Sequence, residues 1–81
     1  MRNIKIGSYY KHFKGNIYKV LDIVYDCEDL EKVVIYEAQY DDKKRWARKY
    51  KDFASLVDKN KYPDVKQKYR FELQEIESVV K

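Results

Sequence analysis

Three consecutive stretches of the chain are rich in β-branched and aromatic residues that sort onto two faces with a period of two, and this pattern constrains the fold most. They span residues 17–25, 33–40 and 44–50. A period of two places successive side chains on opposite faces of a β-strand. Residues 41–43, Asp-Asp-Lys, are typical of a hairpin turn. We therefore predict three consecutive antiparallel strands joined by short connections.

The remaining segments predict small additions to this sheet. Residues 14–16, Lys-Gly-Asn, suit a tight turn in which Gly15 or Asn16 takes a positive φ. A helical turn is expected within 51–58, and a last short strand within 69–73. From Leu73 the apolar spacing changes to that of a short C-terminal amphipathic helix. The expected fold is mostly β: a small bent antiparallel sheet or Src-homology-like barrel with a short C-terminal helix.

The expected core consists of six apolar side chains from these segments: Val20, Val34, Tyr36, Trp46, Phe53 and Phe71. The alternation that buries Trp46 also brings Arg48 to its face. We therefore expect Arg48 either at the mouth of the barrel or displaced by a bulge. The nine tyrosines suit a half-buried sheet, and we expect them mainly to complete the core. A tyrosine-lined binding surface is the alternative.

Residues 43–51 are the best candidate for a functional surface. Six of these nine residues are basic, and two are aromatic. Cations attract phosphate and aromatic faces stack bases, so this composition suits a nucleotide or nucleic acid. Residues 22–31 hold five acids, and we expect them to cancel part of the basic field. Either Arg48 pairs with Glu28 or Glu31, or its fork binds a ligand phosphate.

Composition removes several other function classes. Cys27 is the only cysteine, so no intrachain disulfide forms, and together with His12 it gives too few ligands for structural zinc. A nucleophilic Cys27–His12 pair would need direct contact, and nothing in the sequence predicts it. The acidic residues 28–31 suit a solvated loop better than a magnesium site. We expect no enzyme activity and no cofactor.

The chain also predicts its cellular setting. It has a net charge of +4, no signal-peptide pattern at its start and no window of about 18 apolar residues. We expect a single domain, residues 1–81, in the cytoplasm, with no membrane partner. A homo-oligomer is left open.

Six segments, in order, resemble the motifs of a known family. Residues 12–20, His-Phe-Lys-Gly-Asn-Ile-Tyr-Lys-Val, follow the pattern His-aromatic-Lys-Gly-x-x-Tyr-x-Val. The others are Cys-Glu-Asp-Leu-Glu at 27–31, Val-Val-Ile-Tyr at 33–36, Trp-Ala-Arg-Lys at 46–49, Asp-Phe at 52–53 and Tyr-Arg-Phe at 69–71. Together they resemble the small bacterial and phage family called domain of unknown function 1653. The chain departs from the family pattern at Cys27, Asp29 and Lys49.

The resemblance covers roughly residues 7–72 and leaves residues 73–81 as an acidic extension. It implies a fold and a bacterial or phage lineage, and it supplies no mechanism. A specific version of the ligand hypothesis follows from the lineage alone: a phage protein that sequesters a nucleotide signal made by host defence.

The combined expectation is a non-enzymatic binding module. Its ligand is expected to be anionic and aromatic, either a nucleotide-like small molecule or single-stranded nucleic acid. The expected ligand-binding residues are His12, Lys14, Tyr18, Trp46, Arg48 and Arg70. The alternative is a protein–protein interaction module that uses an edge strand or the C-terminal helix.

Overall fold

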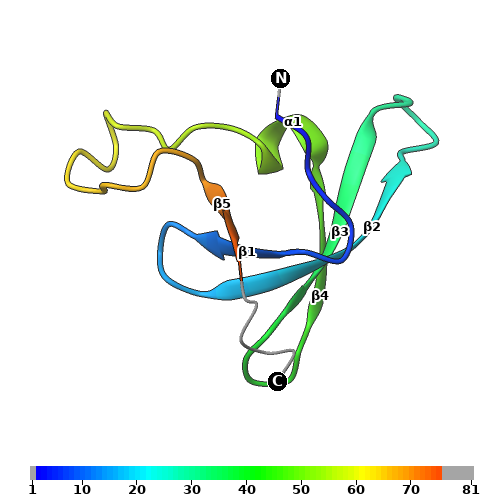
Figure 1. Cartoon of the computed structure of the whole chain (residues 1–81). Helices are drawn as coiled ribbons and strands as arrows, with labels where there is room; N and C mark the ends of the chain where they lie inside the picture. Colours follow the sequence, from blue (N-terminus) through cyan, green and yellow to red (C-terminus); the bar gives the residue numbers. More distant parts are fainter. Residues whose placement is uncertain (1, 76–81) are drawn as a thin grey trace.

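This computed structural model describes residues 2–75. They form a five-stranded antiparallel sheet, one short helix and the loops that connect them. The elements in chain order are β1 (Tyr9–His12), β2 (Ile17–Tyr25), β3 (Lys32–Ala38), β4 (Arg45–Lys49), α1 (Tyr50–Phe53) and β5 (Phe71–Gln74). The strand order in the sheet is β4-β3-β2-β1-β5 (Figure 1). The predicted mostly β fold and its three central strands are confirmed.

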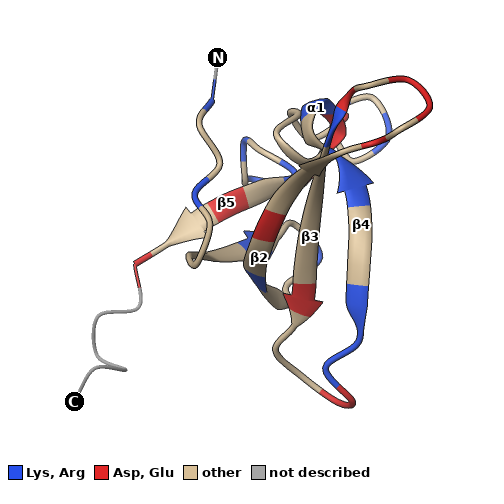
Figure 2. Cartoon of the chain, turned by 90° about the vertical axis from the view of Figure 1, so that its right-hand side faces the viewer, with Lys and Arg blue, Asp and Glu red and all other residues tan. Residues whose placement is uncertain are grey.

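The sheet is open, because β4 and β5 are its two edges and do not pair with each other. Figure 2 shows β4 as the outer strand beside β3, with basic residues at both of its ends. The hairpin between these strands turns at the predicted place, where Asp41 and Lys43 take φ values of 49° and 56°. The first tight turn is also confirmed, with Gly15 at φ 112°.

A bulge in β2 gives the sheet its bend. Val20 pairs with Tyr36, but the next pair is Asp22 with Ile35, so Leu21 is an extra residue. A bulge bends its strand and reverses which residues face the core. Ile23 therefore packs against the core, whereas strict alternation from residue 17 would place it on the opposite face from Val20. That part of the sequence prediction was wrong.

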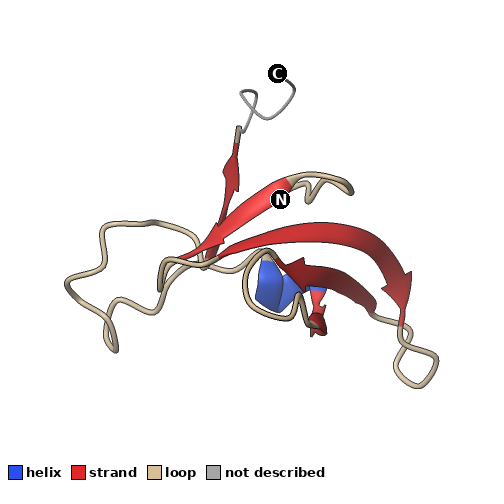
Figure 3. Cartoon of the chain, turned by 90° about the horizontal axis from the view of Figure 1, so that it is seen from below, coloured by secondary structure: helices blue, strands red, loops and turns tan. Residues whose placement is uncertain are grey.

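The core lies inside the curve of the sheet, where α1 contributes its one buried side chain (Figure 3). The ring of Phe53 stacks on Phe71 at 4.1 Å between centroids and meets Tyr10 and Tyr36 edge-on. Five of the six predicted core residues are buried: Val20, Val34, Tyr36, Phe53 and Phe71. Stacked and edge-on rings of this kind add to the energy of simple burial.

Trp46 is the exception, because 47% of it is exposed. Its register opposite Tyr36 does place it on the inner face. However, β4 is an edge strand and no strand closes over it, so the side chain stays at the open end of the sheet.

The N-terminal segment closes the other end of the core. Ile4 is 5% exposed, and its backbone N–H donates to the Tyr50 hydroxyl at 2.8 Å. The N–H of Lys5 donates to the hydroxyl of buried Tyr10 at 2.9 Å. The lead-in segment is therefore part of the fold, which the sequence did not predict.

The predicted last strand is confirmed as β5, which includes Leu73. Leu73 pairs with Tyr10 across the ladder. The rest of the predicted C-terminal helix falls on residues 76–81, which lie outside the described part of the chain.

Candidate anion-binding pocket

A hollow of about 250 Å³ lies where the β1–β2 turn, the end of β4 and the long loop before β5 come together. Its lining is mostly basic and aromatic: His12, Phe13, Lys14, Arg48, Asp58, Lys61, Tyr62 and Arg70. Four of these eight side chains carry a positive charge and one carries a negative charge. Such a lining favours an anion.

His12 and Lys14 are positioned by the tight turn after β1. The backbone N–H of Gly15 donates to the carbonyl of His12 at 2.7 Å, and the N–H of His12 donates to Asn16 at 2.8 Å. The imidazole Nδ1 of His12 accepts the N–H of Lys14 at 3.1 Å. The neutral imidazole therefore carries its proton on Nε2, as a donor.

Arg48 is fixed from two sides. Its Nε–H donates to the hydroxyl of Tyr36 at 3.1 Å, and one terminal nitrogen donates to Asp52 at 2.7 Å. Its guanidinium carbon lies 5.5 Å from the centre of the Phe71 ring. Desolvation opposes the charge of Arg48, but the bonds to Tyr36 and Asp52 outweigh it and raise its pKa. The fork is thus held at the pocket wall and stays charged.

Asp52 of α1 also holds the second guanidinium of the pocket. Its other carboxylate oxygen lies 3.8 Å from a terminal nitrogen of Arg70. The Nε of Arg70 is buried and has no hydrogen-bond partner within residues 2–75. A buried donor without an acceptor is costly.

An aromatic wall faces these cations. The rings of Phe13 and Tyr62 lie 4.8 Å apart, and His12 stacks on Phe13 at 4.5 Å. Asp58 helps to shape the loop that carries Lys61 and Tyr62, because its carboxylate accepts the backbone N–H of Asn60 at 3.0 Å. The negative charge of Asp58 is therefore used within the loop, as an acceptor for backbone N–H groups.

The surroundings of His12 in the pocket lower its pKa from 6.5 to about 4. Burial is the largest cause, followed by the positive charges of Arg48, Lys14 and Arg70. All of these disfavour a second positive charge on the imidazole. Positive charges therefore outnumber negative ones around the imidazole.

Four of the six predicted ligand residues line this one pocket: His12, Lys14, Arg48 and Arg70. Tyr18 does not line it. The hydroxyl of Tyr18 is hydrogen-bonded to that of Tyr40 at 2.8 Å, and burial together with this bond raises its pKa to about 12. Trp46 lines a separate hollow.

Sequence reasoning missed the contributions of Phe13, Lys61 and Tyr62. Phe13 stood inside the motif that singled out His12 and Lys14. Lys61 belongs to a second group of basic residues at 59–70, which was the available signal. Only the loop geometry brings that group to the β1–β2 turn.

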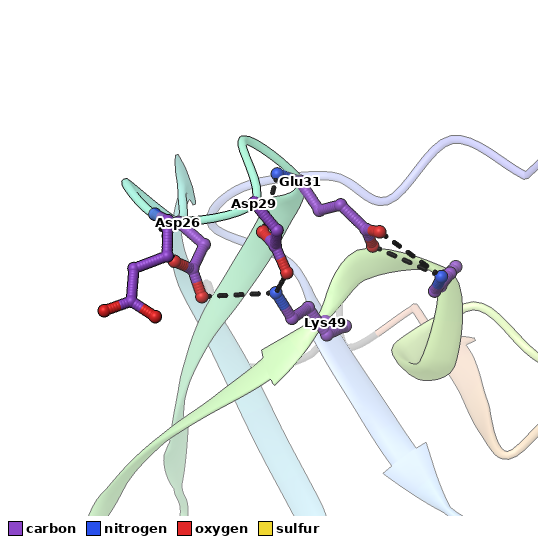
Figure 4. Close-up of polar contacts among 6 residues, drawn as sticks. Asp26, Asp29, Glu31 and Lys49 are labelled. Atoms are coloured by element: carbon purple, nitrogen blue, oxygen red, sulfur yellow. Dashed lines mark hydrogen bonds and ion pairs between the residues drawn. The ribbon is translucent and has the colours of Figure 1, made fainter.

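The acidic β2–β3 loop pairs with lysines rather than with Arg48, so the predicted Arg48–Glu28 or Arg48–Glu31 pair was wrong. Lys49 binds the carboxylates of Asp26 and Asp29, and Lys51 lies 3.3 Å from Glu31 (Figure 4). Neighbouring residues of a strand point to opposite faces. Arg48 therefore faces the core and Asp52, while Lys49 faces the acidic loop. As expected, acids and bases cancel part of the field here.

Other chemistry has little support. Cys27 is exposed in the loop after β2, whereas His12 precedes β2, so the nine residues of this strand separate them. Within residues 2–75 no cluster of His, Cys, Asp or Glu has the arrangement of a metal site. The helix that the structure describes is far too short to cross a membrane.

Comparison with known proteins gives one result. The family described as "Protein of unknown function (DUF1653)" matches residues 8–73. This match covers most of the chain and every residue that lines the pocket. No curated protein and no solved structure matches.

Proposed function

The chain belongs to the DUF1653 family, and we propose that it is a non-enzymatic binding module whose basic pocket holds the phosphate of a nucleotide-like small molecule. The observation that carries this proposal is the convergence of three distant segments on one hollow. The β1–β2 turn, β4 and the loop before β5 each contribute at least one cation to it.

The donors in the pocket suit phosphate. Arg48 uses its Nε and one terminal nitrogen internally, and its other terminal nitrogen makes no hydrogen bond to residues 2–75. Arg70 also lines the pocket, and one of its terminal nitrogens is only loosely paired with Asp52, at 3.8 Å. Guanidinium groups bind phosphate oxygens through paired N–H donors. Lys14 and Lys61 add positive charge at the rim.

The size of the hollow decides how much of a ligand enters. Its volume of about 250 Å³ is slightly below the range of about 300–1,000 Å³ that is typical of pockets for small molecules. A phosphate with part of its sugar fits, and the base then lies outside. We propose that the rings of Phe13 and Tyr62, which line the pocket, contact that base.

A small ligand fits better than a long single strand. A groove for single-stranded nucleic acid needs cations along a track. Here Lys49 and Lys51, the next cations along the chain after Arg48, are neutralised by the acidic loop. The cations that follow Arg48 in the chain therefore do not extend the pocket into a track.

The test is a thermal-shift and calorimetric titration with inorganic phosphate, nucleosides, nucleoside mono-, di- and triphosphates, cyclic nucleotides and short oligonucleotides. We expect saturable binding of one nucleotide per chain and a higher melting temperature by mass action. The matching nucleosides should bind much more weakly. Cyclic nucleotides are included because sequestration of a nucleotide signal is the most specific form of this proposal.

Two variants locate the binding. Arg70→Gln should abolish it, since the guanidinium that lines the pocket is lost. Lys51→Gln is the matched control, because Lys51 is paired with Glu31 outside the pocket, and it should bind normally. Equal affinity in both variants, or equal binding of nucleoside and nucleotide, would contradict the proposal.

Protein–protein interaction through β4 is the second candidate, because β4 is an edge strand with an unpaired side. An extended segment of a partner can add to such an edge. Substituting Ala47 of β4 by proline would block that pairing and leave nucleotide binding intact. The two functions are therefore separable.

A further inference from the structure

A second hollow of about 350 Å³ lies at the tip of the β3–β4 hairpin and shares no lining residue with the basic pocket. Its walls include Tyr40 and Trp46, its apolar lining includes Ala38, and Asp41, Asp42 and Lys44 complete it. Trp46 is 47% exposed and Tyr40 is 36% exposed. Two large aromatic side chains are therefore held at the surface beside a cavity, although neither completes the core.

The charges around this hollow are opposite to those of the basic pocket. Asp41 and Asp42 form no ion pair among the interactions within residues 2–75. The ammonium of Lys44 lies 5.7 Å from the centre of the Trp46 ring. A cation of this chain thus already occupies the face of the indole, which is the geometry of a cation–π contact.

We propose that this hollow binds a methylated ammonium group, with Lys44 as its internal competitor. Trp46 offers its ring face to the positive charge, Tyr40 adds a second aromatic wall, and the carboxylates of Asp41 and Asp42 add attraction at the rim. The methyl group of Ala38 and the rings provide an apolar lining. Methyl groups need no hydrogen-bond acceptor, so an alkylated cation fits this lining better than a strongly hydrated one.

Trp46 is the only tryptophan of the chain, so its fluorescence reports on this site alone. The probes are choline and its neutral isostere 3,3-dimethyl-1-butanol, at matched ionic strength. We expect choline to produce a saturable change in Trp46 emission and to bind about two- to fivefold more tightly than the isostere, the difference expected of an exposed cation–π contact. A trimethyl-lysine amide tests whether the group is carried by a side chain rather than a free small molecule.

Two variants test the charged residues without disturbing the hairpin. Asp41 has φ 49°, a conformation that asparagine also tolerates. The D41N/D42N double variant should keep the fold and weaken choline binding, while binding of the neutral isostere is unchanged. Lys44→Gln removes the competing ammonium and should tighten choline binding. Asp64→Asn in the long loop is the control and should bind as the wild type does.

Three outcomes would overturn the proposal. They are equal binding of choline and its isostere, no effect of D41N/D42N on choline, and a nucleotide that changes Trp46 emission when choline does not. The last outcome would place a base on Trp46. Loss of nucleotide binding in Arg70→Gln leaves the choline response unchanged, so the two proposals fail independently.

Discussion

At the scale of single residues, Arg48 connects the core to the basic pocket. It donates to Tyr36, pairs with Asp52 and lies over Phe71. Its side chain is 30% exposed, so the pair is neither a fully buried one nor a surface one. Both its structural and its ligand-binding roles, which were alternatives from the sequence, are compatible with this position.

Arg48→Ala should therefore lower the free energy of unfolding by about 1–2 kcal/mol, between the values for exposed and buried charge pairs. It should also abolish nucleotide binding. Arg48→Lys should restore neither the stability nor the nucleotide binding, since lysine lacks the planar fork. Arg45→Ala is the control, because Arg45 is 70% exposed in its pair with Glu37, and it should change stability by less than about 0.5 kcal/mol. Urea unfolding and calorimetry measure both effects, and an unchanged Arg48→Ala midpoint would exclude the structural role.

His12 should make stability dependent on pH. Its pKa is about 4 in the folded protein against 6.5 without the fold. Between these values the unfolded chain binds a proton that the folded chain does not, so lowering the pH through this window destabilises the fold. Above pH 6.5 the imidazole is neutral in both states and the effect vanishes. His12→Asn should therefore lose less stability than the wild type between pH 7 and pH 5.

A bound phosphate provides a second readout of His12. A negative charge among Arg48, Lys14 and Arg70 should raise the pKa of the imidazole, which NMR titration of the single histidine measures. A His12 pKa that stays the same with saturating nucleotide would place the ligand elsewhere.

Truncation of Phe53 should destabilise the fold far more than truncation of Trp46. Phe53 is 0% exposed, so Phe53→Ala should cost about 3–5 kcal/mol. Trp46→Ala should cost less than about 1 kcal/mol, since half of the side chain is already in water and leaves no cavity. Denaturant midpoints of the two variants decide this, and a large loss in Trp46→Ala would mean that the open end of the sheet closes in solution.

At the scale of elements, the sequence predicted what depends on neighbouring residues. The hairpin at 41–43 and the turn at Gly15 follow from local turn chemistry, and the three central strands follow from their alternation. The bulge at Leu21 could not be predicted, because no local residue pattern distinguishes it from regular alternation.

Gly15 tests how far the β1–β2 turn controls the pocket. Its φ of 112° is unfavourable for any residue with a Cβ, although no atom lies within 4 Å of where that Cβ would be. Gly15→Ala should therefore cost about 1–2 kcal/mol through backbone strain alone. Because this turn carries His12 and Lys14, nucleotide affinity should fall as well. Normal affinity in a destabilised Gly15→Ala protein would show that the turn does not set the site.

At the scale of the whole molecule, the basic pocket is a product of topology. Alternation and composition singled out Arg48, and the resemblance to the family drew attention to His12 and Lys14. No local pattern indicates that Lys61 and Tyr62 lie beside them, since that depends on a loop spanning residues 54–70. The loop is held by long-range bonds such as Gln67 Nε2 donating to the carbonyl of Lys11 at 2.8 Å.

Ile4 and Ile6 of the N-terminal segment differ in how far they contribute to covering the core. A chain of 81 residues has one small core and a stability of only about 0.05–0.15 kcal/mol per residue, so each part that covers the core matters. Ile4 is 5% exposed and Ile6 is 56% exposed. Ile4→Ala should lower the free energy of unfolding by about 2–4 kcal/mol, and Ile6→Ala by less than about 0.5 kcal/mol.

The comparison isolates burial from chemistry, since the two substitutions are identical and lie two residues apart. Chemical denaturation of both variants measures the difference. The backbone bonds to Tyr50 and Tyr10 remain in Ile4→Ala, so its loss reports on packing alone. Equal midpoints for the two variants would show that the N-terminal segment only lies against the domain. A large difference would show that the packing of Ile4 stabilises the end of the core away from Trp46.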